Sequence, residues 1–254
     1  MNTLADLATV DDVQEYLTIP TANRAASKDE VQRFLTGASS FLIKAINRYP
    51  VVKRYTEIRD GTGGARMILG NAPVVLVNEI KVNGLAISQS PDGTLPGYVV
   101  NDAFITLIGY TFTRGFANVR LDYYAGWVPA AASTWVADHA YELYDFIVDS
   151  NSRVQQVTMP GTSGATQPTW ATALGGTSVD GTVTWTRVEP SPEMLLLERA
   201  AIELTAQKWK RRTHVDESSY SMGGQITTQF STAALPDEVR HVINQLRWSI
   251  PIPR

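Results

Sequence analysis

The predicted fold rests most on the segment Asn118-Val-Arg-Leu-Asp-Tyr-Tyr124, which is followed by Ala-Gly-Trp127. Its β-branched and aromatic residues are typical of a strand, and the glycine closes the run. Earlier segments share this character, and Asn83-Gly84 favours a two-residue hairpin turn. The further strands are predicted in Lys53-Arg-Tyr-Thr-Glu-Ile58, Pro73-Val-Val-Leu-Val-Asn-Glu-Ile-Lys-Val82, Tyr98-Val-Val100 and Phe104-Ile-Thr-Leu-Ile108. Residues 51–127 are therefore expected to form a β region.

Helical patterns lie on both sides of this region. Thr9 is a suitable N-cap for a short helix that ends at Pro20, and Ser27-Lys-Asp-Glu30 reads as a capping box that opens a longer one. Pro192 suits the first position of a helix over residues 191–212, which carries two apolar stripes. A last helix is expected over residues 235–246.

Residues 128–189 differ in composition, with many Gly, Ser and Thr, few charges and three of the six tryptophans. We predict a small all-β domain here, inserted into a discontinuous core of residues 1–127 and 190–254. The predicted fold class is α+β, with a helical bundle core, a β-strand region and this insert.

Composition narrows the functional classes. The chain has 254 residues, 22 Lys+Arg against 25 Asp+Glu, a net charge of −3 and no cysteine. Disulfides, thiolate metal sites and a cysteine nucleophile are thereby excluded. The three histidines are scattered, so we expect no metal site. No signal peptide or apolar run long enough for a membrane span is visible.

Motifs that would indicate catalysis have simpler interpretations. Asp60-Gly-Thr-Gly-Gly64 lacks the Lys-Ser/Thr of a phosphate-binding loop and is expected to be a turn. No Gly-x-Ser-x-Gly motif accompanies the histidines, and the acid pairs Asp11/Asp12 and Asp237/Glu238 fall in first turns of helices. We expect no catalytic residues, no cofactor and no metal.

Three groups of residues are candidate sites. The basic cluster Lys208, Lys210, Arg211 and Arg212 surrounds a tryptophan; nucleic-acid contact is one reading, and a capped helix end with an ion-paired interface is favoured. Trp170 and Trp185 of the insert could stack on a sugar, although a small hydrophobic core is favoured. The C-terminal tail has apolar residues two apart and two prolines that forbid helix, which favours an extended arm that docks on a partner. This arm comprises Arg247, Trp248, Ser249, Ile250, Pro251, Ile252, Pro253 and Arg254.

The order of these pieces resembles the head–tail connector (adaptor) proteins of tailed bacteriophages. The segments that carry the resemblance are Val10-Asp-Asp-Val-Gln-Glu-Tyr-Leu17, Arg48-Tyr-Pro50, Asp122-Tyr-Tyr-Ala-Gly-Trp127, Pro192-Glu-Met-Leu-Leu-Leu-Glu-Arg-Ala-Ala-Ile-Glu-Leu204 and Leu235-Pro-Asp-Glu-Val239. In compact members the Tyr-Tyr-x-Gly strand soon precedes the long helix, whereas here residues 128–189 intervene. Within them, 160–170 and 180–185 resemble a small β module of phage structural proteins that is taken to be carbohydrate-binding-like.

The resemblance implies a non-enzymatic virion protein of the neck, assembled in the host cytoplasm. It implies a homo-oligomeric ring of about twelve copies whose subunits meet head to tail. Such a ring binds the portal protein through the arm, carries double-stranded DNA through its channel without specific contacts, and offers a platform to a stopper, tail terminator or other neck or tail protein. No membrane partner is implied.

Other functions remain open at the level of the sequence. A carbohydrate-binding adhesin of the virion, acting through the insert, is the main alternative. A tail-completion protein would share the ring-forming features of an adaptor. A hydrolase would need an acid, a histidine and a serine that cluster in the folded chain.

Overall fold

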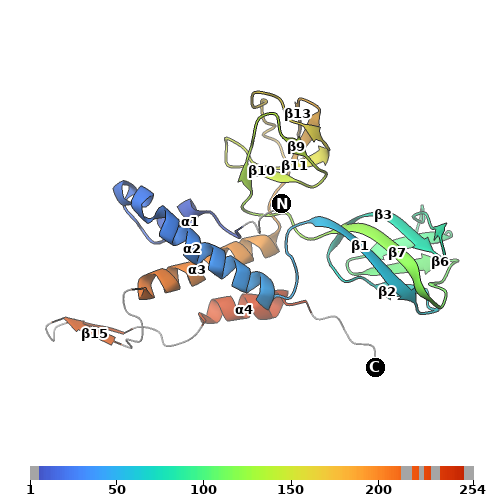
Figure 1. Ribbon diagram of the computed structural model, residues 1–254, viewed down its shortest axis with the longest axis horizontal. Coiled ribbons are helices and arrows are strands. Elements are labelled where there is room, and N and C mark those ends of the chain that lie inside the picture. The colour runs from blue at the N-terminus through green and yellow to red at the C-terminus, as the bar shows by residue number, and fades with distance from the viewer. Residues whose placement is uncertain (1–5, 213–218, 223–225, 230–234, 249–254) are drawn as a thin grey trace. The chain divides into compact units, whose positions relative to one another are not determined.

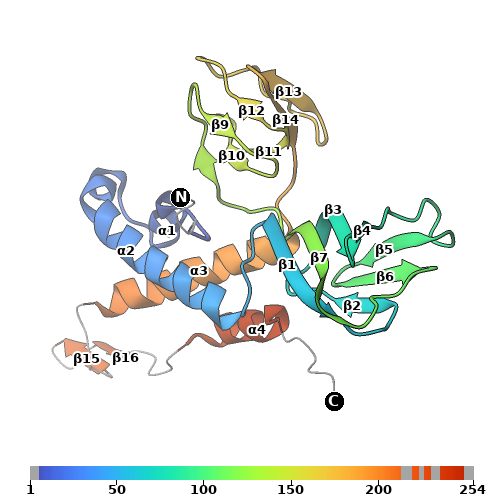
Figure 2. The same ribbon diagram turned by 45° about the vertical axis from the view of Figure 1, so that its right-hand side comes forward.

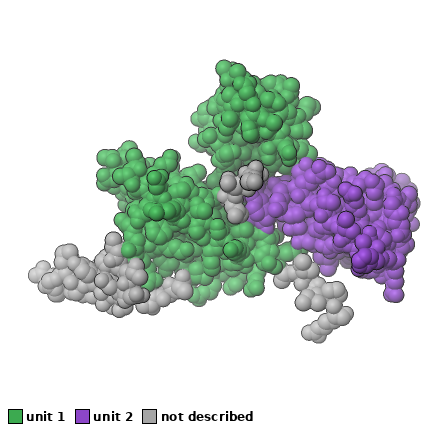
Figure 3. Space-filling view, in the orientation of Figure 1, with its two compact units in different colours: residues 1–48, 129–249 green, residues 49–128, 250–254 purple. Residues whose placement is uncertain are grey.

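The computed structural model describes residues 6–212, 219–222, 226–229 and 235–248, the two short segments after residue 212 by their backbone alone. Of these, residues 6–48 and 129–248 form one compact unit and residues 49–128 form the other (Figure 3).

The unit of residues 49–128 is a two-layered β structure. One sheet has the strand order β1-β7-β3-β4, and the second has the order β2-β6-β5 (Figure 2). The bounds are β1 Lys53–Gly61, β2 Arg66–Ile68, β3 Val74–Val82, β4 Leu85–Ala86, β5 Gly97–Asn101, β6 Phe104–Ile108 and β7 Gly115–Ala125. Side chains from both sheets, including Ile80, Ile105, Leu121 and Tyr123, form its core. The predicted strands and the Asn83-Gly84 hairpin, with both residues at positive φ, are confirmed.

The 122–127 motif has structural roles in this unit. Asp122 accepts hydrogen bonds from Arg54 Nε at 2.9 Å and Nη2 at 2.6 Å, and these bonds hold the pKa of Asp122 below its ordinary value. The Tyr123 hydroxyl donates to Glu57, whose carboxylate also pairs with Arg59. The Trp127 amide donates to the Pro50 carbonyl at 2.7 Å. The motif therefore ties β7 to β1 and to the residues that precede β1.

Four helices occur in the described part of the other unit (Figure 1). They are α1 Val10–Tyr16, α2 Thr21–Ala45, α3 Pro192–Arg211 and α4 Asp237–Leu246, and α3 contacts the other three. The stripe of Met194, Leu197, Ala201 and Leu204 on α3 is buried, as predicted from its spacing. Thr9 caps α1 and Pro192 begins α3, which confirms both predicted starts. Two backbone strands, β15 Ser219–Met222 and β16 Ile226–Gln229, pair between α3 and α4 in the sequence.

The predicted start of the second helix is wrong. Instead of beginning at a Ser27 cap, α2 begins at Thr21, and Ser27 lies inside it. The Ser27 hydroxyl donates to the Asn23 carbonyl at 3.1 Å and accepts from Gln14 Nε2. The alanine-rich residues before Ser27 are good helix formers, so the helix continues upstream and the serine bonds back to the preceding turn.

Residues 133–187 form a separate β module with its own core. One sheet has the order β13-β14-β11-β10-β8, and β12 pairs with β9. The bounds are β8 Ser133–Thr134, β9 Ala140–Tyr141, β10 Phe146–Val148, β11 Val154–Met159, β12 Gly161–Thr162, β13 Thr177–Asp180 and β14 Val183–Arg187. Trp185 is fully buried at its centre, where Tyr141 and Trp170 pack edge-on against it.

The expectation of a helical bundle core is wrong. The described residues contain only four helices, and their strands are divided among several sheets. The long apolar stripes of α2 and α3 suggested a dominant bundle, but residues 49–128 and the module each bury a β core of their own. The division into a discontinuous 1–127 and 190–254 core with a 128–189 insert stays a prediction.

Candidate functional site

The start of the C-terminal arm is fixed against the end of α2. The Trp248 amide donates to the Ile46 carbonyl at 2.8 Å, and the Trp248 carbonyl accepts from Asn47 Nδ2 at 3.2 Å. These two bonds hold the backbone of Trp248 from both sides. Residues 249–254, the rest of the predicted arm, lie outside the described residues.

Arg48 reinforces this attachment. Its Nη2 donates to the Leu246 carbonyl at 2.8 Å, at the C-terminal end of α4, where cations are favoured by the helix dipole. Its guanidinium carbon lies 5.7 Å from the centre of the Trp248 ring, within the range of a cation–π contact. Arg247, between these residues, is exposed. Arg48 belongs to the predicted Arg-Tyr-Pro motif, whose role in holding the arm could not be read from its spacing.

The helix that leads into the arm is held against α3. Val239, Val242 and Leu246 of α4 are buried. Arg199 of α3 lies 3.4 Å from Glu203 and 3.2 Å from Glu238 of α4, between their carboxylates. Burial and the nearby Glu238 raise the pKa of Glu203. The start of the arm is thus connected to both long helices.

The basic residues at the end of α3 differ in their contacts within the chain. The guanidinium of Arg212 lies 3.7 Å from the centre of the Trp209 ring and 3.6 Å from the Glu30 carboxylate. Trp209 in turn packs edge-on against Phe34 of α2, with ring centres 6.3 Å apart. Arg211 is half-buried. Lys208 and Lys210 are exposed, so these two lysines offer positive charge to solvent or to a partner.

The second apolar stripe of α3 is only partly covered. Ala206 is buried, Ile202 and Trp209 are half-buried, and Leu195 is 47% exposed. Leu196 beside it is 36% exposed. The first turns of α3 therefore present uncovered leucines, whereas the other stripe is packed against the neighbouring helices.

Trp170 and Trp185, the two candidate sugar-binding tryptophans of the β module, do not present a ring to solvent. Trp185 is 0% and Trp170 is 6% exposed. The carboxylate of Asp180 accepts from Trp185 Nε1 at 3.2 Å and from Trp135 Nε1 at 2.7 Å. These contacts support the core interpretation, since a sugar stacks on an exposed aromatic face. Trp135, which is half-buried, packs against the same core.

The candidate metal ligands and the histidines are dispersed in the part of the chain that the structure describes. No group of three or more metal-binding side chains gathers in this part. His139 is exposed and stacks edge-on against Tyr141, and His241 is exposed on α4. His214 lies outside the described residues. Within the same residues, no helix combines the length and apolarity that a bilayer crossing requires.

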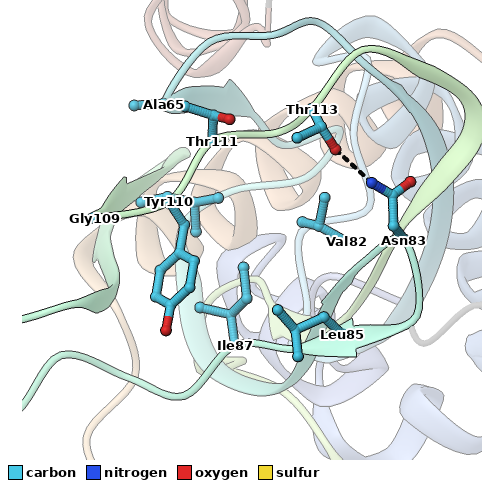
Figure 4. Close-up of a pocket in the computed structure, with 10 residues that line it drawn as sticks. Ala65, Val82, Asn83, Leu85, Ile87, Gly109, Tyr110, Thr111 and Thr113 are labelled. Carbon is cyan, nitrogen blue, oxygen red and sulfur yellow. Dashed lines mark hydrogen bonds between the residues drawn. The ribbon is translucent and has the colours of Figure 1, made fainter.

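The unit of residues 49–128 contains a pocket that the sequence did not reveal (Figure 4). Its volume is about 640 Å³, and its walls carry no charged side chain. Val82, Ile87 and Leu107 form its buried floor, while Leu85 and Tyr110 are exposed at its rim. Its residues come from three segments that are distant in sequence: Ala65 before β2, the β3–β4 hairpin with the adjoining Ile87, and β6 with the loop after it.

Comparisons with known proteins give limited similarity. No family model matches the sequence, and no curated protein matches it. One similar solved chain belongs to the neck of an empty GTA particle computed with C6 symmetry; it is 12% identical, covers 99% of this chain and 95% of its own, and has a TM-score of 0.46. Another belongs to the neck of a native GTA particle computed with C12 symmetry, with 13% identity, the same coverages and a TM-score of 0.44. Similarity at this level leaves the function to be argued from the residues.

Proposed function

We propose that this chain is a structural protein of a phage neck, a ring-forming adaptor that joins the portal to the next neck or tail protein. The observation that carries the proposal is the fixed start of the arm at Trp248, described above. An arm that leaves from a rigid point loses less entropy on docking than one that also has to order its base. The sequence order shared with phage adaptors supplies the identity of the partner.

The arm has the composition of a docking segment. Ile250 and Ile252 are apolar and alternate with Pro251 and Pro253. Proline restricts the conformations of the unbound arm. The arm therefore loses less conformational entropy when a partner binds it and buries the two isoleucines. The arm, from Arg247 to Arg254, is the proposed portal-binding segment.

Ring formation is supported by the uncovered leucines of α3. Leu195 and Leu196 lie one turn from the N-terminal end of a helix whose opposite stripe is already buried. A ring subunit needs two different faces that meet head to tail, and these leucines suit one of them. About twelve copies per ring is the number that the adaptor resemblance implies.

A DNA channel is compatible with the charge of the chain. The net charge is −3, so a ring of such subunits attracts DNA only weakly overall. Lys208 and Lys210 are the exposed members of the basic cluster, and they are proposed to face the channel or the neighbouring subunit. DNA can then pass without being held.

The arm is tested by removing it without disturbing its base. A chain that ends at Trp248 should fold as the full chain does, since the contacts of Trp248 with α2 remain. It should bind the portal protein encoded by the same genome at least about tenfold more weakly, which is a modest loss for buried isoleucines at an interface. The readout is co-sedimentation with purified portal rings.

Matched variants separate docking from folding. Trp248→Ala removes the ring that contacts the Arg48 guanidinium and keeps the two backbone hydrogen bonds, so it should weaken portal binding less than removal of residues 249–254 does. Leu174→Ala, at a position that is 64% exposed in the insert, should bind like the unaltered chain. Unchanged portal binding by the chain that ends at Trp248 would count against the proposal.

A further inference from the structure

Phe116 is the most exposed of the large apolar side chains in the described residues, at 90%. It lies at the beginning of β7, four residues after Phe112, which is fully buried. A solvent-exposed phenylalanine at this level of exposure keeps its whole ring in water, which is unfavourable. The structure around it shows why the ring stays there.

The turn that carries Phe116 is held rigidly. The Ala117 amide donates to Asp60 Oδ1 at 2.7 Å, and Ala117 has a φ of +48°, a conformation that is unfavourable for a residue with a Cβ. Asn118 accepts from the Gly61 amide at 2.8 Å and donates to the Thr113 carbonyl at 2.8 Å. These bonds fix the backbone of the turn next to Phe116, whose ring is exposed.

The same hydrogen bonds reach the rim of the apolar pocket. Asn118 Nδ2 also donates to Asn83 Oδ1 at 3.0 Å, and Asn83 Nδ2 donates to Thr113 Oγ1 at 2.7 Å (Figure 4). Asn83 and Thr113 both line the pocket. Hydrogen bonds thus connect the turn that carries the exposed ring to the rim of the pocket.

The pocket suits an aromatic side chain. Its floor of Val82, Ile87 and Leu107 is apolar, and the rim tyrosine, Tyr110, offers an aromatic edge. The polar rim groups Asn83 and Thr113 already bond to one another, so they do not require a polar ligand. A charged ligand would find no counter-charge on its walls.

We infer that Phe116 of one copy of this chain inserts into the pocket of a second copy. The occupant and the pocket match in apolarity and in the absence of charge, and a volume of about 640 Å³ has room for a phenyl ring and for flanking residues of the turn. Because all copies of the chain are identical, the exposed Phe116 of one copy can contact the pocket of another copy. This contact goes beyond portal binding, which is proposed for the arm, and either can fail without the other.

The test measures self-association of the full chain by sedimentation equilibrium, with no portal present. Phe116→Ala and Leu85→Glu should each weaken association by about 30-fold or more, the loss expected for a central aromatic anchor. Ile58→Ala, at a position that is 66% exposed on β1, should associate like the unaltered chain. Thermal melting should change little for Phe116→Ala, because the ring is exposed before association.

A mixing experiment tests the contact itself. Phe116→Glu chains and Leu85→Lys chains should each self-associate weakly, and a mixture of the two should recover association that falls with added salt. The inference is overturned if the unaltered chain stays monomeric at all concentrations reached, or if neither Phe116→Ala nor Leu85→Glu changes its association. It is also overturned if association depends instead on residues 249–254, which would make the arm the occupant of the pocket.

Discussion

Gly126 shows at the scale of one residue why the Ala-Gly-Trp motif contains a glycine. Its φ is +133°, and a Cβ at this position would lie 2.6 Å from the backbone of Val51. Both the backbone angle and the close approach exclude a side chain. Gly126→Ala should therefore lower the free energy of unfolding of the 49–128 unit by about 2–4 kcal/mol in urea titrations.

Gly37 provides the matched control for this substitution. It is exposed within α2, and a Cβ there would meet nothing within 4 Å. Gly37→Ala should stabilise the chain by about 0.5–1 kcal/mol, because alanine is the better helix former. Equal effects of the two substitutions would show that Gly126 is not required by its conformation.

Asp180 is a single residue on which the stability of the β module depends. Its carboxylate is buried and accepts three hydrogen bonds, from Trp135 Nε1, Trp185 Nε1 and the Gly164 amide. Asp180→Ala would leave these donors without a partner and should cost about 3 kcal/mol of module stability. The change is measured by tryptophan fluorescence during urea unfolding, and Glu142→Ala, at an exposed position of the module, is the control. A loss no larger than that of the control would remove Asp180 from this role.

Residues that act on their immediate neighbours in the chain could be predicted from the sequence. The Thr9 cap, Pro192 at the start of α3 and the Asn83-Gly84 turn depend on a few neighbouring residues, and each is confirmed. The contacts of Arg48 with Leu246 and Trp248 span about 200 positions of the chain, and no spacing rule brings such residues together. The pocket, whose walls come from separate strands, was missed for the same reason.

At the scale of elements, α3 carries a half-buried carboxylate whose protonation depends on α1. The pKa of Glu198 is raised from its ordinary value of 4.5 to about 7, first because burial disfavours the charged form and second because of the nearby Asp12 charge. A raised pKa means that the folded chain binds the proton more tightly than the unfolded chain. The resulting stability is complete below about pH 4.5 and is lost as the pH rises to about 7.

Glu198→Gln should remove this dependence. The unaltered chain should lose free energy of unfolding between pH 5 and pH 8, because Glu198 loses its proton over this range. Glu198→Gln should make this loss smaller by about 1–2 kcal/mol, after allowance for solvent screening of a half-buried group. Urea unfolding at the two pH values measures the difference. Glu193→Gln, in the first turn of the same helix, serves as the control, and an identical pH dependence in both variants would contradict the assignment.

Elements were predicted better than their assembly. Periodicity of apolar residues predicted the buried stripe of α3 and the strands of residues 49–128, because the burial of one face of a helix or strand determines this periodicity. The start of α2 was misplaced, since Ser27 forms a capping pattern in the sequence but an internal hydrogen bond in the fold. The prediction of a helical bundle core was wrong, because the periodicity of apolar residues does not show how many separate hydrophobic cores a chain forms.

At the scale of the whole molecule, the β module is proposed to be an insert that the remainder does not need. Its core residues, such as Ile147, Val157 and Trp185, pack with one another. Replacing residues 131–188 by a short Gly/Ser linker should leave a chain that melts cooperatively and binds portal rings. Circular dichroism and co-sedimentation provide the two readouts. A chain that fails to fold after this excision would show that the module belongs to the main core.

The proposed neck protein forms a ring on the portal through an arm whose base is fixed at Trp248. Native mass spectrometry of the purified chain with portal rings measures this most directly. We expect a complex that contains about twelve copies of the chain per portal ring, and we expect this complex to be lost when the chain ends at Trp248. A full-length chain that folds but adds no mass to the portal rings would contradict it.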